Sequence, residues 1–386
     1  MVAMTANWDL TFLGLFLLLF AVVAALATVL PQGDRRWWWL ATLLAGLVAS
    51  GLVVGVGWTR SLLIEAAGFV AVALVWNEGT LAAARAARCF LLLLIVSAVC
   101  LAAGLLLVGT GRNQPPVLHD LLAVGLVAVG FGLKLALVPF YFWLPGVAAA
   151  SKPMTTLLIV GMVDVAAFLE LAHLRVAHAW VVTDWQGLWL ALALCSMLGG
   201  ALLALAQQDV KRMLAFSTID DMGYLLVGVV AGPGIGLSGA LLGALSHAAM
   251  KTLLFGAVAV AEGREGHAVT LDSRGLAATY PVSAAAFILG ALGILGVPPI
   301  FGFLGRWRLY LAGVEQGGAP VLLGMLLATS LAVLYYARTI HRVWLGHPGG
   351  SDPGGEPRLA AAVLLALMIL VVLLGLFPGW LTGRLS

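Results

Sequence analysis

The sequence predicts an all-α polytopic membrane protein. Of its 386 residues, 62% are hydrophobic and only 10% are charged, and the mean hydropathy is +1.09. Soluble domains carry about 25% charged residues, so this composition is typical of a membrane protein. The apolar runs also exceed the ~20 residues with which a helix crosses a bilayer. The basic residues lie mostly in short loops, and no nucleic-acid partner is expected.

Proline, glycine and charged residues divide the chain into apolar segments that predict about twelve transmembrane helices. Their ranges are 9–30, 37–57, 61–77, 86–109, 117–149, 154–175, 185–206, 211–231, 235–261, 281–316, 320–345 and 358–382. The fifth is interrupted by Pro139 and Pro145, and the tenth by Pro298 and Pro299. The first run has neither a cationic leader nor a cleavage site of small residues, so we expect a retained helix.

Loop charges predict the orientation. Loops and helix ends after odd-numbered helices contain Arg35, Arg36, Arg85, Arg88, Lys152, Lys211, Arg212, Arg264, Arg274, Arg338, Arg342 and Arg358. The opposite side contains only Arg60, Arg112, Arg175 and Arg384. Because cytoplasmic loops carry the excess of Lys and Arg, the first side is expected to be cytoplasmic. Both termini are then expected on the outer side. The membrane is expected to be the inner membrane of a bacterium.

The two interrupted helices lie five crossings apart, which predicts an internal repeat. An odd displacement turns the second copy upside down relative to the first. We therefore expect two N-terminal helices in 1–60, a five-helix repeat in 61–207 and an inverted copy in 208–386, each with its broken helix third. Inverted repeats with discontinuous helices are common in ion and solute transporters. The freed carbonyls at a proline break must be satisfied by protein or water.

Several charged residues remain inside the predicted helices. The basic ones are Lys134, Lys251, Arg306 and Arg308, and the deepest acidic ones are Glu65 and Asp164. A charge at the centre of a membrane helix costs about 2.5–3.5 kcal/mol on insertion scales. A single charge near a helix end, such as Arg308 or Glu170, favours a structural ion pair. Lys134, Glu65 and Lys251 are spread over three helices in both repeats, which favours an ion path.

These residue types suit proton transfer. A lysine inside a protein can release and rebind a proton near neutral pH, and a nearby carboxylate controls that exchange. His247 lies four residues before Lys251, so both are expected on one helix face. A packed, hydrogen-bonding histidine and a proton relay are equally compatible with this position.

Four ordered motifs resemble one family. They are FGLKLALVPFYFWLPG (131–146), QDVKRMLAFSTIDDMGY (208–224), LSHAAMKTLLF (245–255) and GVPPIFGFLGRW (296–307). The resemblance is to the proton-translocating antiporter-like subunits of respiratory complex I, membrane-bound hydrogenases and multi-subunit sodium/proton antiporters, and it covers about residues 61–345. IEAAGFVAVALVWNEG (64–79) resembles the acidic helix of the quinone-reductase subunits, which are the most similar in pattern. By that resemblance, Glu65 pairs with Lys134. Family members usually have fourteen helices, so two at the front are expected to be missing here.

The resemblance also implies partners. Other membrane subunits of a respiratory, hydrogenase or antiporter complex are expected, with the lipid bilayer, and protons or sodium as the transported ion. Redox cofactors are expected in the partner subunits and none in this chain. The resulting proton path is Glu65–Lys134–Asp164–His247–Lys251, with Arg306 at its far end.

The sequence departs from the family pattern at several positions. Tyr141, Gly146 and Lys152 replace the usual histidine, aspartate and alanine of the first broken helix. Asp164 stands where a bridging lysine is usual, Asp220 and Asp221 where small polar or histidine residues are usual, and Arg306 where lysine or glutamate is usual. Arginine keeps its proton, so Arg306 can steer charge but cannot relay a proton.

Three hypotheses follow. The first is a proton-translocating subunit of a redox-driven complex, the second a sodium/proton antiporter subunit driven by ion gradients, and the third a transport-inactive scaffold. No nucleotide-binding loop, metal-ligand cluster or nucleophile–base set is present in the sequence, so a non-catalytic subunit is expected. A stand-alone solute carrier explains none of the motifs.

Overall fold

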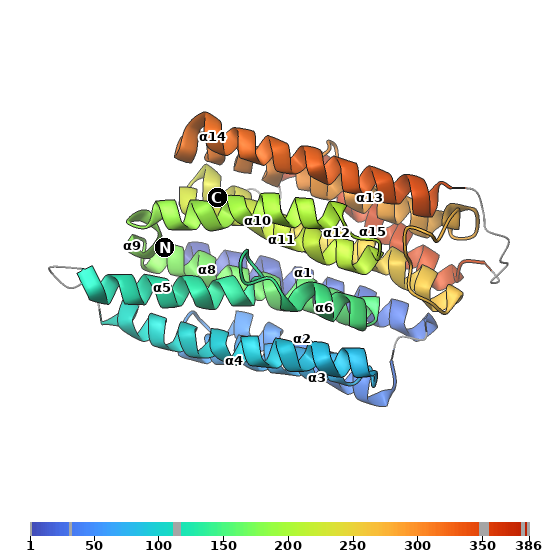
Figure 1. Cartoon of the computed structure of the whole chain (residues 1–386), viewed down its shortest axis with the longest axis horizontal. Coiled ribbons are helices and arrows are strands. Elements are labelled where there is room, and N and C mark those ends of the chain that lie inside the picture. The colour runs from blue at the N-terminus through green and yellow to red at the C-terminus, as the bar shows by residue number, and fades with distance from the viewer. Residues whose placement is uncertain (1, 31–32, 111–116, 347–354, 380–382, 384–386) are drawn as a thin grey trace.

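The computed structural model describes residues 2–30, 33–110, 117–346, 355–379 and 383, and these form helices and connecting loops without a β-strand. The first half contains α1 (Val2–Val29), α2 (Arg35–Val53), α3 (Trp58–Trp76), α4 (Leu81–Gly109), α5 (Val117–Lys134), α6 (Trp143–Ala150), α7 (Pro153–Leu158), η1 (Ile159–Val163), α8 (Asp164–Ala177), α9 (Trp180–Thr183) and α10 (Gln186–Leu205). The second contains α11 (Val210–Ala231), α12 (Ile235–Glu265), η2 (Leu276–Ala278), α13 (Pro281–Leu295), α14 (Gly302–Thr339), η3 (Ile340–Trp344) and α15 (Arg358–Leu376). The long helices run side by side along one direction (Figure 1).

The predicted all-helical membrane fold is confirmed. In the described ranges, ten helices are long and apolar enough to cross a membrane. The predicted crossing 117–149 is divided into α5 and α6, and the crossing 281–316 into α13 and the first part of α14. The repeat boundaries at 60 and 207 remain predictions.

α14 contains a reversal of the chain. Gly318 has φ = 61° inside this helix and Pro320 follows it. The hydroxyls of Tyr310 and Thr329 are hydrogen-bonded, although a straight helix would separate these residues by about 28 Å. α14 is therefore two antiparallel arms, which correspond to the predicted helices that end at 316 and begin at 320.

Side-chain caps explain several helix starts. The carboxylate of Asp34 accepts a hydrogen bond from the backbone N–H of Trp37 at the start of α2. Asp209 does the same for the N–H of Arg212 at the start of α11, and Thr80 caps α4 through the N–H of Ala83. Each cap satisfies a backbone donor that has no partner within its helix.

α11 and α12 form the centre of the bundle. Both are buried all round, as is almost all of the α7–η1–α8 segment. Helices such as α4, α14 and α15 bury only one stripe and expose apolar residues on the other side. A helix that is apolar all round belongs in a core. The candidate functional side chains lie on, or point toward, these buried helices.

The first break differs in detail from the prediction. Residues 135–142 separate α5 from α6 and contain Pro139, whereas Pro145 lies in the first turn of α6, where a missing N–H removes no helical hydrogen bond. Within the break, the N–H of Val138 donates to Ser196 Oγ, and across the break Trp143 Nε1 of α6 donates to the carbonyl of Leu133 near the end of α5. Side chains thus satisfy backbone groups that the break frees.

The second break spans residues 296–301 between α13 and α14 and contains both Pro298 and Pro299. Gly296 has φ = 76°, and a Cβ atom there would meet the Cβ of Arg306 at 2.7 Å. Glycine is therefore required at this position by both its conformation and its neighbour.

From the sequence, Arg60 and Arg175 were counted among the loops and helix ends, and the structure places both inside the bundle. Arg60 lies within α3 and Arg175 within α8, and both side chains are buried. α3 begins earlier and α8 ends later than the apolar runs suggest. Long polar side chains therefore lie inside the bundle where the sequence alone indicates its edge.

Candidate functional site

Lys134 joins three helices in the first half of the chain. It is the last residue of α5, and its side chain is buried. Its Nζ atom lies 2.6 Å from Glu65 Oε1 on α3 and 3.1 Å from Glu170 Oε2 on α8. The contact expected between Glu65 and Lys134 is present. Glu170 is a second carboxylate partner that sequence reasoning assigned to a structural ion pair.

Asp164 lies beside this group without joining it. It follows the π-helical turn η1, and its side chain is 1% exposed. In the described part of the chain, Asp164 pairs with neither Lys134 nor Lys251, and its Oδ2 atom has no hydrogen-bond partner. Lys134 and Asp164 both line one small cavity. Its other lining residues are Phe90, Leu94, Ser97, Leu133, Trp143 and Val163. π-helical turns are frequent at functional sites.

The charges of this region do not balance. Three carboxylates, those of Glu65, Asp164 and Glu170, face one ammonium group, that of Lys134. An uncompensated buried charge is costly, and a bound proton is the simplest way to remove one. The arrangement is therefore suited to holding and releasing a proton beyond the one on Lys134.

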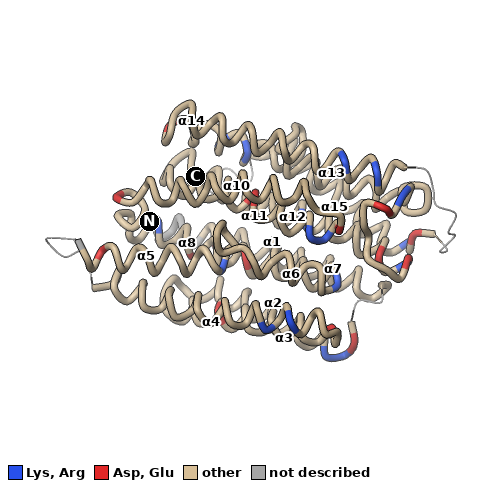
Figure 2. The backbone as a smooth tube through the Cα atoms, in the orientation of Figure 1, with Lys and Arg blue, Asp and Glu red and all other residues tan. Residues whose placement is uncertain are grey.

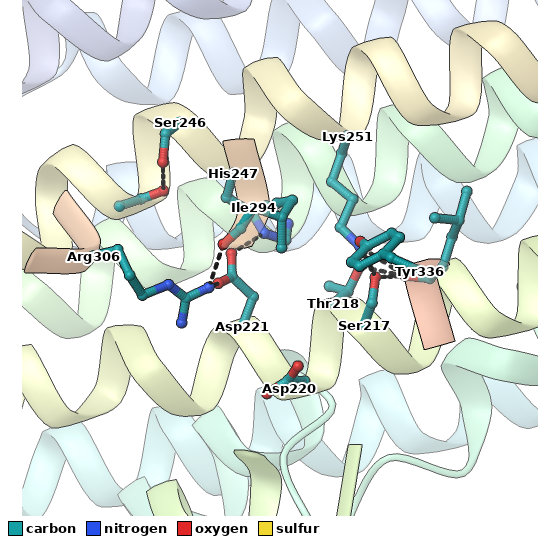
Figure 3. A network of polar contacts seen from close by, with 12 residues as sticks. Ser217, Thr218, Asp220, Asp221, Ser246, His247, Lys251, Ile294, Arg306 and Tyr336 are labelled. Carbon is teal, nitrogen blue, oxygen red and sulfur yellow. Dashed lines mark hydrogen bonds and ion pairs between the residues drawn. The ribbon is translucent and has the colours of Figure 1, made fainter. Parts of the chain in front are cut away.

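Asp221 is the centre of a second group, in the other half of the chain (Figure 3). Its Oδ1 atom accepts from an Arg306 NH2 group of α14 at 2.6 Å, and its Oδ2 atom lies 2.7 Å from His247 Nδ1 on α12. The Arg306 guanidinium also donates to the carbonyl of Ile294 at 2.7 Å and lies 3.7 Å from the centre of the Tyr224 ring. Arg306 thus ties the broken end of α13 to α11.

His247 has one ring nitrogen that makes no hydrogen bond within the part of the chain that the structure describes. Because its Nδ1 faces the Asp221 carboxylate, that nitrogen is assigned the hydrogen. Its Nε2 atom is buried and has no hydrogen-bond partner among the described residues. A neutral imidazole in this state can accept one proton at Nε2.

Lys251 is fully buried and has no carboxylate in ion-pair contact within the described chain. Its Nζ atom donates to the carbonyl of Leu214 at 2.8 Å and to the hydroxyl of Ser217. Tyr336 also donates to Ser217 Oγ, at 3.1 Å. Figure 3 shows His247 and Lys251 reaching toward the same helix, α11, as their shared face predicts.

Asp220 completes this region. Its Oδ2 atom accepts from the hydroxyl of Tyr335 at 3.2 Å, and its Oδ1 atom is buried without a partner in the described residues. Asp220 and Asp221 balance the charges of Lys251 and Arg306. From the sequence, both aspartates were noted as acidic residues near the helix ends and as departures from a family pattern, and no partner was assigned to either. The opposite charge of Arg306 was the signal that could have identified a partner for one of them.

Comparison with known proteins identifies the family of this chain. Residues 62–333 match the model of the family described as "NADH:quinone oxidoreductase/Mrp antiporter, TM". The chain belongs to this family. The resemblance drawn from the four motifs is thereby confirmed.

Two relatives illustrate the extent of the match. NADH-quinone oxidoreductase subunit N of Chlorobium chlorochromatii is 34% identical over 67% of this chain and 53% of its own length. Subunit N of Geobacter metallireducens is 30% identical over 94% of this chain and 82% of its own length. The matched part of the chain spans about half the length of several of these relatives. The share is 53% for the Chlorobium subunit, and 56% and 57% for the subunits N of Nitrosomonas europaea and Jannaschia.

Solved structures share the fold. A chain of respiratory complex I from Thermus thermophilus with bound aureothin is 26% identical, with a TM-score of 0.81 over 100% of this chain and 87% of its own. A chain of the Mrp complex from Dietzia is 22% identical, with a TM-score of 0.88 over 99% of this chain and 82% of its own.

Proposed function

We propose that this chain is a proton-translocating membrane subunit of a redox-driven complex of the NADH:quinone oxidoreductase or membrane hydrogenase type. The observation that carries the proposal is the contact of Lys134 with both Glu65 and Glu170 at the broken end of α5. Here a proton can leave the ammonium nitrogen for a carboxylate oxygen without changing the total charge of the group. Electrostatic changes imposed by a partner can then shift that equilibrium.

The proposed path continues through Asp164 to His247 and Lys251. The η1 turn that precedes Asp164 packs against α12, the helix that carries both His247 and Lys251. Asp164, Asp220 and His247 each have a buried polar atom without a hydrogen-bond partner in the described residues. Such atoms are where ordered water binds in protein interiors, and water would complete the connection between the two groups.

Arg306 has a fixed role in this proposal. Its guanidinium keeps its proton and holds Asp221 ionised, so it sets the local charge and passes no proton itself. A proton that reaches the second half is exchanged at His247 Nε2 or Lys251. The path therefore does not need a titrating group at position 306.

The proposal extends to location, organisation and partners. Lys and Arg gather mainly toward the end of the bundle that lies away from the label N (Figure 2), and we assign that end to the cytoplasm. The chain would lie in a bacterial inner membrane with both termini outside, and 61–207 and 208–386 would be the inverted repeats. Other membrane subunits would surround it, and the redox cofactors would lie in those partners.

The test uses the complex that copurifies with the full chain, reconstituted in liposomes containing a pH-sensitive dye. Lys134→Ala and Glu65→Gln should each slow proton pumping at least about tenfold while sparing electron transfer in the soluble partner. Lys152→Ala is a matched control, because its side chain is 43% exposed and lies outside the buried groups.

The alternatives give different results in the same assay. Proton movement that requires sodium and no electron donor would identify an antiporter subunit. Pumping that persists in both Lys134→Ala and Glu65→Gln would contradict the proposal and leave a scaffold role for this chain.

A further inference from the structure

A third buried ionic group lies outside the site described above. We define the Asp9 cluster as Trp8, Asp9, Arg60 and His173, which come from α1, α3 and α8. Asp9 Oδ2 accepts from Arg60 NH1 at 2.8 Å, and Asp9 Oδ1 lies 3.6 Å from His173 Nε2. The rings of Trp8 and His173 are 5.7 Å apart. All four residues are buried, with Asp9 the most exposed at 8%.

The cluster concentrates polar atoms that lack partners. Trp8 Nε1, Asp9 Oδ1, Arg60 Nε, Arg60 NH2 and His173 Nε2 are all buried without a hydrogen-bond partner in the described residues. Buried polar groups are nearly always satisfied, and several unsatisfied ones at one place indicate a bound ligand. The atoms include donors and acceptors at short range, and a water molecule, which both donates and accepts, can satisfy them. A proton acts differently, because it binds to one of the acceptors and turns it into a donor.

The ring of His173 identifies where a proton binds. Its Nδ1 atom lies 2.7 Å from the carbonyl oxygen of Leu169, and because a carbonyl only accepts, Nδ1 carries a hydrogen. In the neutral ring, Nε2 is then an acceptor and faces Asp9 Oδ1, which is also an acceptor. Neither has another partner in the described residues. A proton on His173 Nε2 would let it donate to Asp9 Oδ1, and a bridging water could donate to both atoms. Either would remove the repulsion between the two acceptors.

The cluster is adjacent to the Lys134 site. Glu170 and His173 lie three residues apart on α8 and therefore share a helix face. Glu170 contacts Lys134 Nζ at 3.1 Å. The charged groups that act on His173 are Asp9, Arg60 and Glu170. Ionisable side chains thus continue from α5 through α8 to α1 and α3.

The cluster also lies near one end of the bundle. Arg60 is the third residue of α3, and residues 54–57 before that helix are exposed. His173 lies one turn before the last residues of α8, whose C-cap is His178. This is the end at which α1 and α3 begin, opposite to the one we assign to the cytoplasm.

We propose that the Asp9 cluster is a proton-binding site that exchanges protons with Lys134 through Glu170 and leads to the face where α1 and α3 begin. In the exchange, an N–H bond of Lys134 breaks as an O–H bond forms on Glu170, and that O–H bond breaks as an N–H bond forms at His173 Nε2. Water next to Asp9 then removes the proton. This inference rests on the proposed function and adds a branch to its path.

A direct test measures protonation of His173 in the unmodified chain. The complex is labelled with 15N-histidine and studied in lipid by solid-state NMR, and the His173 signal is identified by its loss in His173→Gln. We expect its Nε2 to gain a proton as the pH falls, and Asp9→Asn or Glu170→Gln to move the midpoint of that titration. A signal that stays neutral, or a midpoint that neither variant moves, would overturn the proposal.

A transport assay separates this inference from the proposed function. His173→Gln cannot carry a proton and should slow pumping about tenfold, as should Asp9→Asn. His178→Gln, five residues along the same segment, should leave the rate unchanged. If Lys134→Ala stops pumping and His173→Gln does not slow it, the branch is wrong and the proposed function stands. If neither Lys134→Ala nor Glu65→Gln slows pumping, the proposed function fails, and the NMR titration alone decides whether the cluster binds a proton.

Discussion

Arg306 and Asp221 are direct partners, 2.6 Å apart across α14 and α11. Either charge without the other would lack its ion-pair partner inside the bundle. Together they leave the charge of this region balanced. Arg306 also donates a hydrogen bond to the carbonyl of Ile294 at the end of α13, so it stabilises the second broken helix.

Removing one charge of this pair should destabilise the fold. Removing both should cost less than the two single changes added together. Arg306→Gln leaves the Asp221 carboxylate buried with only His247, and we expect a loss of about 3–5 kcal/mol in the free energy of unfolding. The double variant Arg306→Gln/Asp221→Asn should lose less than the sum of the single variants, with a coupling of about 1–3 kcal/mol. Thermal unfolding in detergent measures all four forms. Strict additivity would show that the contact contributes nothing.

Gly296→Ala should destabilise the second break. The new Cβ would lie 2.7 Å from Arg306 Cβ, at a residue with φ = 76°. Positive φ at a residue other than glycine costs about 1–3 kcal/mol, so a clear fall in melting temperature is expected. Gly146→Ala is the matched control, because nothing lies within 4 Å of its added Cβ in α6. Equal melting temperatures for the two variants would contradict this role of Gly296.

Lys251→Arg should separate charge from proton transfer. Arginine keeps a positive charge near Ser217 and Leu214 but does not release its proton near neutral pH. We expect the complex to assemble while pumping falls at least about tenfold. Assembly is checked by copurification, and pumping by acidification of liposomes. Normal pumping by this variant would show that Lys251 serves only as a fixed charge.

The N-cap of α2 should depend on pH. Hydrogen bonds from the Trp37 N–H and the Asn77 side chain hold the pKa of the Asp34 carboxyl below its ordinary value of 3.8. The pKa of Asp34 is lower in the folded state than in the unfolded state. The ionised carboxylate therefore contributes its full stabilisation above the unfolded-state pKa, and this stabilisation is lost as the pH falls through the folded-state pKa.

Hydrogen exchange at the Trp37 amide should therefore show a protection that decreases below pH 3.8 after correction for the intrinsic rate. Asp34→Ala should have low protection at every pH. A wild-type protection that does not change with pH would contradict a role for the ionised carboxylate. Asp34 lies in the loop before α2 and is exposed, so the effect should be confined to the first turn of that helix.

Local properties of the sequence were sufficient for the membrane fold, for the two broken helices and for the position of Lys134. Apolar length, proline and loop charge act on segments of about 20 residues, so they can be recognised without knowing which segments pack together. The pairing of Glu65 with Lys134 was also expected, through the resemblance of the surrounding motifs.

Only the tertiary structure decided which polar side chains meet. Glu170 contacts Lys134 across 36 residues of chain, and Asp221 contacts Arg306 across 85. His173 faces Asp9 across 164 residues of chain. The central helices α11 and α12 are buried all round, so they have no polar face that would reveal their rotation. Side-chain packing sets that rotation, and with it the neighbours of each buried charge.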